Sequence, residues 1–393
     1  GSHEVSKSTS KSPTSKKNLP KTCGQCHSDI SKKYSESIHG VALEKGVKES
    51  PSCTDCHGEH NILKHDDPQS PVSFQNLSRE VCSPCHSSLK LSEKYGITSD
   101  RFETFSDSYH GLAIEGGSVA VANCASCHGS HNIKPSSDST STISKVNLVK
   151  TCGGCHPGAN NNFTIGKIHI TRQDESEPII YLIATTYITL IFLVIGGMFL
   201  HNLIDFFRKS KIKKMKQRGL IREEKFGHAL YLRMNLNDRI QHATLAISFL
   251  LLVVTGFMLS YPNAWWVSHI RDLSSEAFEY RSLIHLITAV VMVAVSLYHI
   301  YYVSFTERGR TLIKDLLPRY KDIRDAIDVA KFNLGISKVK PKLDRFSYVE
   351  KAEYWALVWG TIVMTATGII MWFDNTFMGL FTKLGWDIAR TVH

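Results

Sequence analysis

Hydrophobic and polar positions divide the chain near residue 177. The second part contains four apolar runs that lack Asp, Glu, Lys and Arg: Ile179–Ile204, Ile240–Ser260, Leu283–Ser304 and Tyr354–Phe373. A helix that crosses a bilayer needs about 20 apolar residues in succession. The pattern therefore predicts four transmembrane helices and an all-α helical bundle for this part of the chain.

The first part, residues 1–177, is polar and rich in Ser, Lys, Cys and His, so we expect loops and short helices there. The sequence starts with Gly-Ser-His rather than Met, which we interpret as a processed mature end or a cloning remnant. Four segments follow from these patterns: a flexible tail at 1–20, a soluble domain at 21–175, the first transmembrane helix with a basic loop at 176–236, and a membrane domain at 237–393.

Positive charge is concentrated between the apolar runs. The 393-residue chain has a formal net charge of +10. Residues 208–225 hold nine basic and two acidic side chains, and residues 307–345 hold eleven and six. Such loops usually face the cytoplasm, which places the polar domain outside a multi-pass membrane protein. Because no nucleic-acid-binding motif accompanies these loops, we expect the lipid bilayer as a partner and no nucleic acid.

All ten cysteines lie in five Cys-x-x-Cys-His units, a pattern typical of covalent attachment of haem c. Zinc ribbons, thioredoxin-like pairs and disulfides also use cysteine, but they do not explain five units that consume every thiol. Their similarity to c-type cytochromes implies five haem c groups and a location in the periplasm, at the bacterial inner membrane. The units comprise Cys23, Cys26 and His27; Cys53, Cys56 and His57; Cys82, Cys85 and His86; Cys124, Cys127 and His128; and Cys152, Cys155 and His156.

The phrases CTDCHGEHNI (Cys53–Ile62) and CASCHGSHNI (Cys124–Ile133) belong to a longer repeat, and a truncated third copy contains Cys152. The copies add five further histidines, one for each haem. A second axial histidine suits electron transfer rather than ligand chemistry. We therefore predict five distal ligands, although solvated loop histidines remain the alternative: His39, His60, His110, His131 and His169. We expect His60 and His131 to serve neighbouring haems, and we interpret His65 as a surface residue or a substitute ligand.

Histidines in the apolar runs indicate b-type haem. Histidine inside a membrane is costly and usually functional. His285 and His299 are fourteen residues apart, so they share a helix face and are separated by roughly 21 Å. This spacing suits two stacked haem b groups, with His393 expected on the outer side beside His285 and His242 on the inner side beside His299. Interfacial or inter-helix hydrogen-bonding roles are the alternative for these four, and we assign an interfacial role to His201.

The stretch DRIQHATLAISFLLLVVTGFML, with RSLIH, AKFNLG and ARTVH, resembles the cytochrome b subunit of respiratory formate dehydrogenases over residues 237–393. Related hydrogenase and thiosulfate-reductase subunits belong to the same group. The resemblance implies a four-helix core, two haem b groups and a quinone site. It matches His242, His285 and His393 to ligand positions, and Asn333 and Gly335 to the quinone-site phrase. The family's last helix, with a further ligand, has no counterpart here, so either His299 or a residue beyond 393 fills that position.

The chain as a whole resembles inner-membrane cytochromes in which a multihaem cytochrome c domain is fused to a cytochrome b module. We therefore expect a quinol–cytochrome c oxidoreductase that exchanges electrons between menaquinone, or another quinone, and a periplasmic redox partner. The alternative is the membrane anchor of a periplasmic dehydrogenase or hydrogenase, which passes electrons inward to quinone. A multihaem reductase with its own substrate site is less favoured, because the distal histidines leave no open iron. No catalytic side chain is predicted, and a homo-oligomer stays open.

Overall fold

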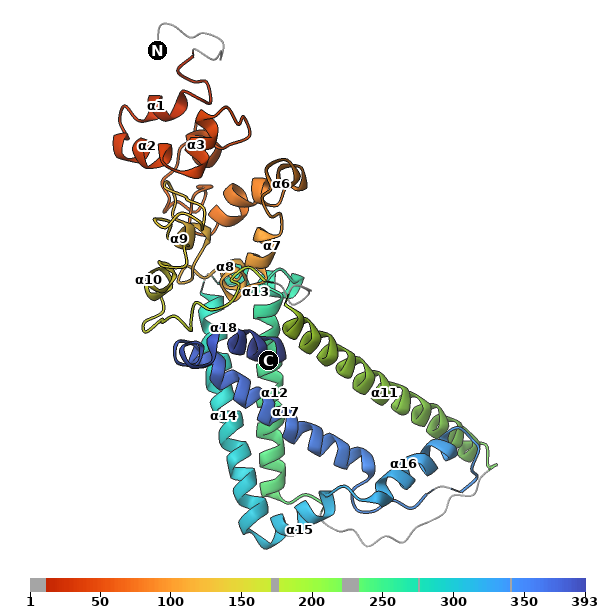
Figure 1. Ribbon diagram of the computed structural model, residues 1–393. Helices are drawn as coiled ribbons and strands as arrows, with labels where there is room; N and C mark the ends of the chain where they lie inside the picture. The colour runs from red at the N-terminus through yellow and green to blue at the C-terminus, as the bar shows by residue number, and fades with distance from the viewer. Residues whose placement is uncertain (1–11, 171–176, 221–232, 275, 340) are drawn as a thin grey trace. The chain divides into compact units, whose positions relative to one another are not determined.

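The computed structural model describes residues 12–170, 177–220, 233–274, 276–339 and 341–393. Residues 1–11 of the expected N-terminal tail lie outside these ranges. Secondary structure in the described residues is helical, without strands (Figure 1), which agrees with the expected all-α class. Two compact units can be distinguished, and we describe each by itself.

The motif unit comprises Gly1–Asp174, Thr255–Leu283 and Phe373–Asp387, and it contains all five Cys-x-x-Cys-His units. It is built from short helices and loops. Its helices are α1 (Leu19–Cys23), α2 (Ser28–Ser35), α3 (Ile38–Glu44), α4 (Cys53–His57), the π-helical turn η1 (Leu77–Cys82), α5 (Ser83–His86), α6 (Leu89–Tyr95), α7 (Arg101–Ser106), α8 (Tyr109–Glu115), α9 (Cys124–His128), α10 (Leu148–Gly153) and α13 (Trp265–Leu273).

A loop of the form Ser-x-x-Ser-x-x-Asn-Leu occurs three times and precedes the first Cys-x-x-Cys-His unit of each repeat. In each loop the Asn side chain donates a hydrogen bond to the carbonyl oxygen of the first Ser, at 2.8 to 3.0 Å. These bonds satisfy backbone groups locally, as turn-forming Asn residues usually do. The three donor–acceptor pairs are Asn18 with Ser12, Asn76 with Ser70, and Asn147 with Ser141.

The π-helical turn η1 has a simple origin in this repeat. Four residue steps separate Leu from Cys in the first and third copies, Leu19 to Cys23 and Leu148 to Cys152, but five separate Leu77 from Cys82. A π turn accommodates one extra residue in a helix. Copy two therefore carries a one-residue insertion, and η1 lets Cys82 start its unit as the other copies do.

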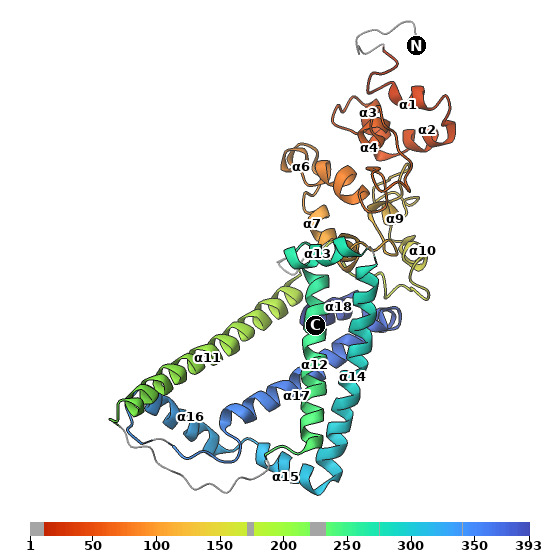
Figure 2. The ribbon, with the colours of Figure 1, turned by 180° about the vertical axis from the view of Figure 1, so that it is seen from behind.

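The helical unit comprises Glu175–Val254, Ile284–Trp372 and Ile388–His393. Several helices continue from one unit into the other, so the division does not follow the predicted segment boundaries. The longer helices are α11 (Pro178–Gln217), α12 (Leu236–Ser260), α14 (Ala277–Phe305), α15 (Glu307–Leu316), α16 (Tyr320–Asn333), α17 (Tyr348–Trp372) and α18 (Asp374–Val392). α12 and α14 run side by side in both views (Figures 1 and 2).

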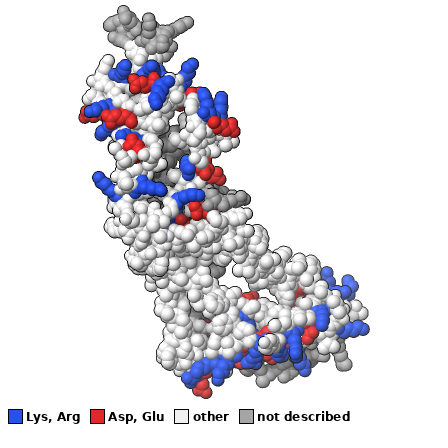
Figure 3. All heavy atoms as spheres, viewed as in Figure 1, with Lys and Arg blue, Asp and Glu red and all other residues white. Residues whose placement is uncertain are grey.

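Four helices are long and apolar enough to cross a membrane: Pro178–Gln217, Leu236–Ser260, Glu279–Phe305 and Tyr348–Trp372. They confirm the four predicted spans. Their apolar side chains are largely exposed, as for Phe192 at 74 % and Leu193 at 69 %. Exposed apolar surface on this scale indicates contact with lipid. On the face shown in Figure 3, Lys and Arg gather over α15 and α16, the region of the second basic loop.

Candidate functional site

In the described parts of the chain, ten histidines form five facing pairs. The ring centroids in every pair are 6.1 to 6.4 Å apart, whereas the angle between the ring planes ranges from 7° to 65°. The narrow spread of distances and the wide spread of angles indicate separation along a common axis rather than direct ring stacking. The pairs are His39–His86, His57–His131, His110–His156, His128–His169 and His285–His393.

This separation fits two imidazoles on opposite sides of one metal ion. With metal–nitrogen bonds of about 2.0 Å, the two ring centroids lie about 6.4 Å apart, and either ring can rotate about its bond. In the described part of the chain, no group of three or more His, Cys, Asp and Glu side chains is arranged to hold a metal. The geometry therefore suits haem iron, whose porphyrin supplies four ligands and leaves two axial positions.

Four of the pairs join histidines from different copies of the repeat. Copy one contains the units at Cys23 and Cys53, copy two those at Cys82 and Cys124, and copy three the unit at Cys152. His39 of copy one faces His86 of copy two, and His110 of copy two faces His156 of copy three. In the opposite direction, His131 of copy two faces His57 of copy one. Each copy therefore supplies imidazoles to its neighbours, as we expected for His131, and the structure assigns which ring faces which.

His169 faces His128, the second unit of copy two. The sequence alignment of copies places His169 level with His39 and His110, which face first units. In the structure it instead occupies the position that His131 has relative to His57. A third copy that lacks the second Cys-x-x-Cys-His unit thus still supplies the ring that copy two needs.

His27, His60 and His65 are the exceptions among the histidines of residues 12–170. All three are exposed, and the side chain of His60 is 98 % exposed beside Glu59. Within the described residues none of them faces another histidine ring. The structure therefore pairs His27, a predicted proximal ligand, with no described distal histidine. It also pairs His60, a predicted distal ligand, with the histidine of no described Cys-x-x-Cys-His unit.

Hydrogen bonds between Nδ1 and residues distant in sequence orient three of the paired rings, and Nδ1 of a fourth ring, His131, lies 3.3 Å from the hydroxyl of the adjacent Ser130. The hydroxyl of Thr104 donates to Asp100 O, at 2.9 Å, so its oxygen accepts from Nδ1–H of His169, at 3.1 Å. Asn375 Oδ1 accepts from Nδ1 of His156 at 2.9 Å. In both cases the hydrogen bond places the ring's proton on Nδ1 and leaves the Nε2 lone pair for a metal, an arrangement common at metal-binding histidines.

His393 is oriented in the same way by α17. The hydroxyl of Thr367 donates to Val363 O at 2.8 Å, and its oxygen lies 2.9 Å from Nδ1 of His393. Gly368 gives the ring room, since a Cβ at this position would lie 3.3 Å from the ring carbon Cε1 of His393. Sequence reasoning missed these Thr and Asn residues, because nothing in their local sequence marks them as supports of a ligand.

Local backbone structure fixes His39 and His110 identically. Each follows a capping serine, Ser37 or Ser108, whose hydroxyl accepts from the N–H of the next glycine, Gly40 or Gly111, at 3.0 to 3.1 Å. A Cβ on Gly40 would approach a carbonyl oxygen to 2.1 Å, and on Gly111 to 2.2 Å. Glycine is thus required at both positions, and the repeated Ser-x-His-Gly phrase is explained by this close packing.

Burial favours the neutral form of several paired rings of the motif unit. It lowers the pKa of His39 to about 4, with a smaller contribution from His86. Burial likewise lowers the pKa of His169 to about 4, assisted by Arg101. The pKa values of His57, His86 and His128 are lowered by burial as well. A neutral imidazole has a free lone pair, which metal binding requires.

Thiols of consecutive units lie next to one another, and none of the ten cysteines forms a disulfide. A hydrogen bond to Cys124 and burial raise the pKa of Cys82. Burial and the neighbouring Cys23 raise the pKa of Cys53 to about 11. Burial and the charges of Cys152, Cys124 and Cys155 raise the pKa of Cys127 to about 11. The units therefore follow one another closely in space in chain order.

The two other predicted haem b ligands, His299 and His242, lie apart from these pairs. Both ring nitrogens of His299 make hydrogen bonds, Nδ1 with Gln241 Oε1 at 2.8 Å and Nε2 with Tyr354 Oη at 3.0 Å. His242 on α12 is exposed and faces no other described histidine ring. His299 thus has the inter-helix hydrogen-bonding arrangement that we considered as its alternative, and the structure does not bring it to His242.

Residues 333–335, which we predicted to belong to the quinone site, contact α11. Asn333, the last residue of α16, donates to Asp205 Oδ1 at 3.2 Å. Gly335 has a φ of 83°, a conformation that favours glycine, and Arg208 lies 3.9 Å from the position a Cβ would take. On the same helix His201 Nε2 lies 3.1 Å from the hydroxyl of Tyr348. This polar cluster gives His201 a specific partner that its sequence position did not suggest.

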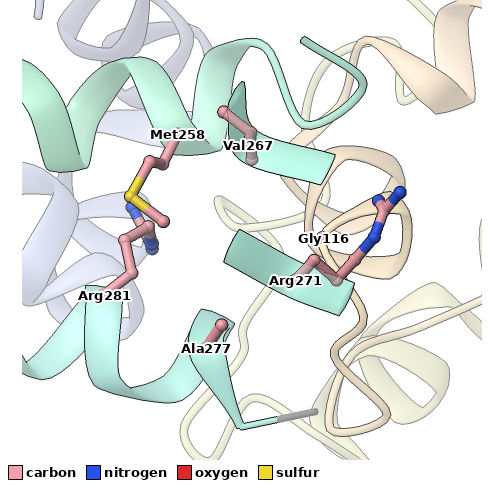
Figure 4. Close-up of a pocket in the computed structure, with 6 residues that line it drawn as sticks. All are labelled: Gly116, Met258, Val267, Arg271, Ala277 and Arg281. Atoms are coloured by element: carbon pink, nitrogen blue, oxygen red, sulfur yellow. The ribbon is translucent and has the colours of Figure 1, made fainter. Parts of the chain in front are cut away.

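The motif unit also contains a small cavity, shown in Figure 4, where Met258 lies beside Arg281 and Arg271 extends away from them. Arg271 donates to Glu115 O at 2.6 Å, and Arg281 donates to Thr255 O at 3.2 Å. These guanidinium groups thus bind protein carbonyls, and no histidine or cysteine reaches the cavity. We assign it a packing role. Its lining residues are Gly116, Met258, Val267, Arg271, Ala277 and Arg281.

Residues 233–393 match the prokaryotic cytochrome b561 family. This family consists of membrane cytochromes with b-type haem, and its role is electron transfer across the membrane. The match covers less than half of the chain and includes the pair His285–His393. It confirms a relationship to membrane cytochromes b for this part of the chain. No curated protein and no solved structure matches the chain.

Proposed function

We propose, on the premise of the cytochrome b561 match, that this chain is a quinol–cytochrome c oxidoreductase of the bacterial inner membrane. It would exchange electrons between menaquinone, or another quinone, and a redox partner in the periplasm. The observation that carries this proposal is the set of five histidine pairs with metal-spanning separation, four of which include the histidine of a Cys-x-x-Cys-His unit. Haem, when bound, supplies one-electron exchange at iron.

The chain's own residues would perform three tasks. Cysteine thiols of the five units would hold haem c covalently, and the paired imidazoles would fill both axial positions at four of them. His285 and His393 would hold one haem b, and His242 and His299 remain the residues that we propose for the second. Thr104, Thr367 and Asn375 would keep the Nδ1 proton in place, so that each supported ring presents Nε2 to the metal.

Composition of the interior also supports haem in the motif unit. The largest side chains that are less than 2 % exposed are Thr104, Ser37, Ser52 and Ser70, all of them small and polar. A soluble unit of this length normally buries a sizeable apolar core. Porphyrin faces between the histidine rings would add apolar surface to the few buried apolar side chains of this unit, such as Leu43, Ile114 and Phe163.

A pyridine haemochrome assay tests the cofactor content. We expect five haem c and two haem b per chain, with covalent mass retained after denaturation. The variant His393→Ala should lose the haem b that His285 and His393 would hold and keep the other haem b and all haem c, whereas His131→Ala should keep both counts but change the spin state of one haem c. A protein without covalent haem would overturn the proposal.

The quinone would bind near Asn333 at the end of the membrane helices where the basic loops lie. Asn333 and Asp205 offer an amide and a carboxylate, and the pair His201–Tyr348 offers a further proton-accepting nitrogen and a hydroxyl. Reduction of quinone consumes two protons, so titratable groups at this site suit its chemistry. The variant Asn333→Leu should slow reduction of haem b by a menaquinol analogue at least ten-fold, while dithionite still reduces it fully. The variant Gln217→Leu, at the exposed last residue of α11, is the control.

The same polar cluster favours a second candidate, the membrane anchor of a periplasmic dehydrogenase or hydrogenase. Electrons that arrive from outside would then reach quinone where protons come from the cytoplasm. The two candidates differ in the direction of flow. Proteoliposomes with quinone inside the bilayer decide between them, because an anchor should reduce quinone when a low-potential periplasmic donor is added and should copurify with its dehydrogenase.

A further inference from the structure

Consecutive repeats exchange axial histidines at each junction, and the exchange follows one rule. A ring from the earlier copy faces the first unit of the later copy, as His39 faces His86. A ring from the later copy faces the second unit of the earlier copy, as His131 faces His57. A backbone bond accompanies them, from Ile38 N to Ile133 O at 2.8 Å.

Applied to copy one, the rule requires a further neighbour. His27 is the first unit of copy one, so its distal ring should come from an earlier copy. His60 corresponds to His131, so it should face the second unit of an earlier copy. Ile62 corresponds to Ile133, and its carbonyl should accept the accompanying backbone bond. No Cys-x-x-Cys-His unit precedes Cys23 in the sequence.

The exposure of these residues agrees with an open junction. Ile62 is 63 % exposed, whereas Ile133 is half-buried. His60 is 98 % exposed, whereas His131 is half-buried against His57. His27 is the one proximal histidine that is exposed and lacks a facing ring among the described residues. The surface around His27, His60 and Ile62, which we call the open junction, is thus the part of copy one that the equivalent contact buries in copy two.

We propose that the open junction accepts a further copy of the same haem-binding repeat. That copy would present an imidazole to the iron at Cys23–His27 and would receive His60 on an iron of its own. The inference rests on the proposed function, since it requires haem at Cys23–His27. In the 393-residue chain, the haem at Cys23–His27 would then have one open axial position. Nitrogen ligands of the imidazole class would bind at that position.

Sequence similarity supports the register. Gly1–His3 reads Gly-Ser-His, as does Gly129–His131. His3 therefore stands where His131 stands, eight to ten residues before the first loop of its repeat. His3 lies outside the described residues, so the experiment includes it as a variant.

The test uses the 393-residue chain, matured with haem and purified in detergent. Haem is first counted with the pyridine haemochrome assay, and a shortage of haem c refutes the proposed function before the inference is tested. With five haem c present, we expect a high-spin ferric EPR signal from one haem in five, which free imidazole converts to low-spin. His131→Ala should add a second high-spin haem, and His60→Ala, His65→Ala and His3→Ala should leave the signal unchanged.

Two results would overturn the inference. One is a fully low-spin chain, and the other is a signal that appears only when His3, His60 or His65 is replaced, because the chain would then supply its own ligand. Protein isolated from native membranes identifies the source of the further copy. Low-spin haem in a longer polypeptide indicates the same chain, and low-spin haem with a separate c-type cytochrome indicates a partner. A native sample that keeps the high-spin haem contradicts docking at the open junction.

Discussion

Thr367 offers a direct test of how the membrane histidine pair is supported. In Thr367→Val the side chain keeps its shape but loses the oxygen that lies 2.9 Å from Nδ1 of His393. The Nδ1 proton then lacks an acceptor, or moves to Nε2 and blocks the nitrogen that should bind iron. Loss of such a supporting hydrogen bond lowers metal affinity by about 10- to 100-fold, which corresponds to about 1.4 to 2.7 kcal/mol.

The assay is transfer of haem b from the purified protein to excess apomyoglobin, read from the haem b absorbance band. We expect Thr367→Val to lose its outer haem b at least ten-fold more readily than the parent protein. The midpoint potential of that haem should rise, because a less basic imidazole stabilises ferric iron less. Thr365→Val, two residues away on α17, is the matched control and should leave both quantities unchanged. Identical retention and potential in the two variants would refute the role of Thr367.

Further predictions concern the motif unit. Gly40→Ala should displace the segment of His39 and make the haem at His86 high-spin in EPR. Gly111→Ala should instead displace His110 and make the haem at His156 high-spin. Asn375→Leu should raise the midpoint potential of the haem at His156 without changing the haem count, and an unchanged redox titration would argue against the bond at 2.9 Å. Because the pKa of His39 and of His169 is about 4, protonation competes with iron only in acid. The low-spin spectrum should therefore persist from pH 7 to about pH 5 and decline below about pH 4, and its loss already near pH 6 would contradict this burial.

Membrane helices were predictable because lipid imposes a composition that a single chain segment must satisfy alone. The four spans are confirmed on that ground. The family relationship of the C-terminal part was also predictable, because phrases such as RSLIH and AKFNLG are local. His285 was expected beside His393, but the pairing within the motif unit was not predictable, since His57 and His131 are brought together by folding across two repeats. The three Ser-x-x-Ser-x-x-Asn loops were present in the sequence, but their serines and asparagines suggest ordinary turns until the hydrogen bonds of Asn18, Asn76 and Asn147 are seen.

The supporting residues were harder still to predict. Thr367 and Asn375 belong to helices whose sequences give no sign of metal chemistry, and their role depends on where a distant ring lies. His299 shows the limit of spacing as evidence, because its ring nitrogens make hydrogen bonds with Gln241 and Tyr354. Spacing along one helix constrains depth, but it does not determine which neighbour the side chain meets.

The exchange of rings between repeats has a consequence for how the protein is made. If the motif unit is exported and binds haem as proposed, the segment around Cys53 would emerge before His131, so a haem attached there would have one axial side open until the next repeat arrives. Assembly would therefore proceed in sequence order, with each repeat completing the axial ligands of the repeat before it. Deletion of copy two would remove the histidine partners of both copy one and copy three, so the remaining haems would lack axial ligands.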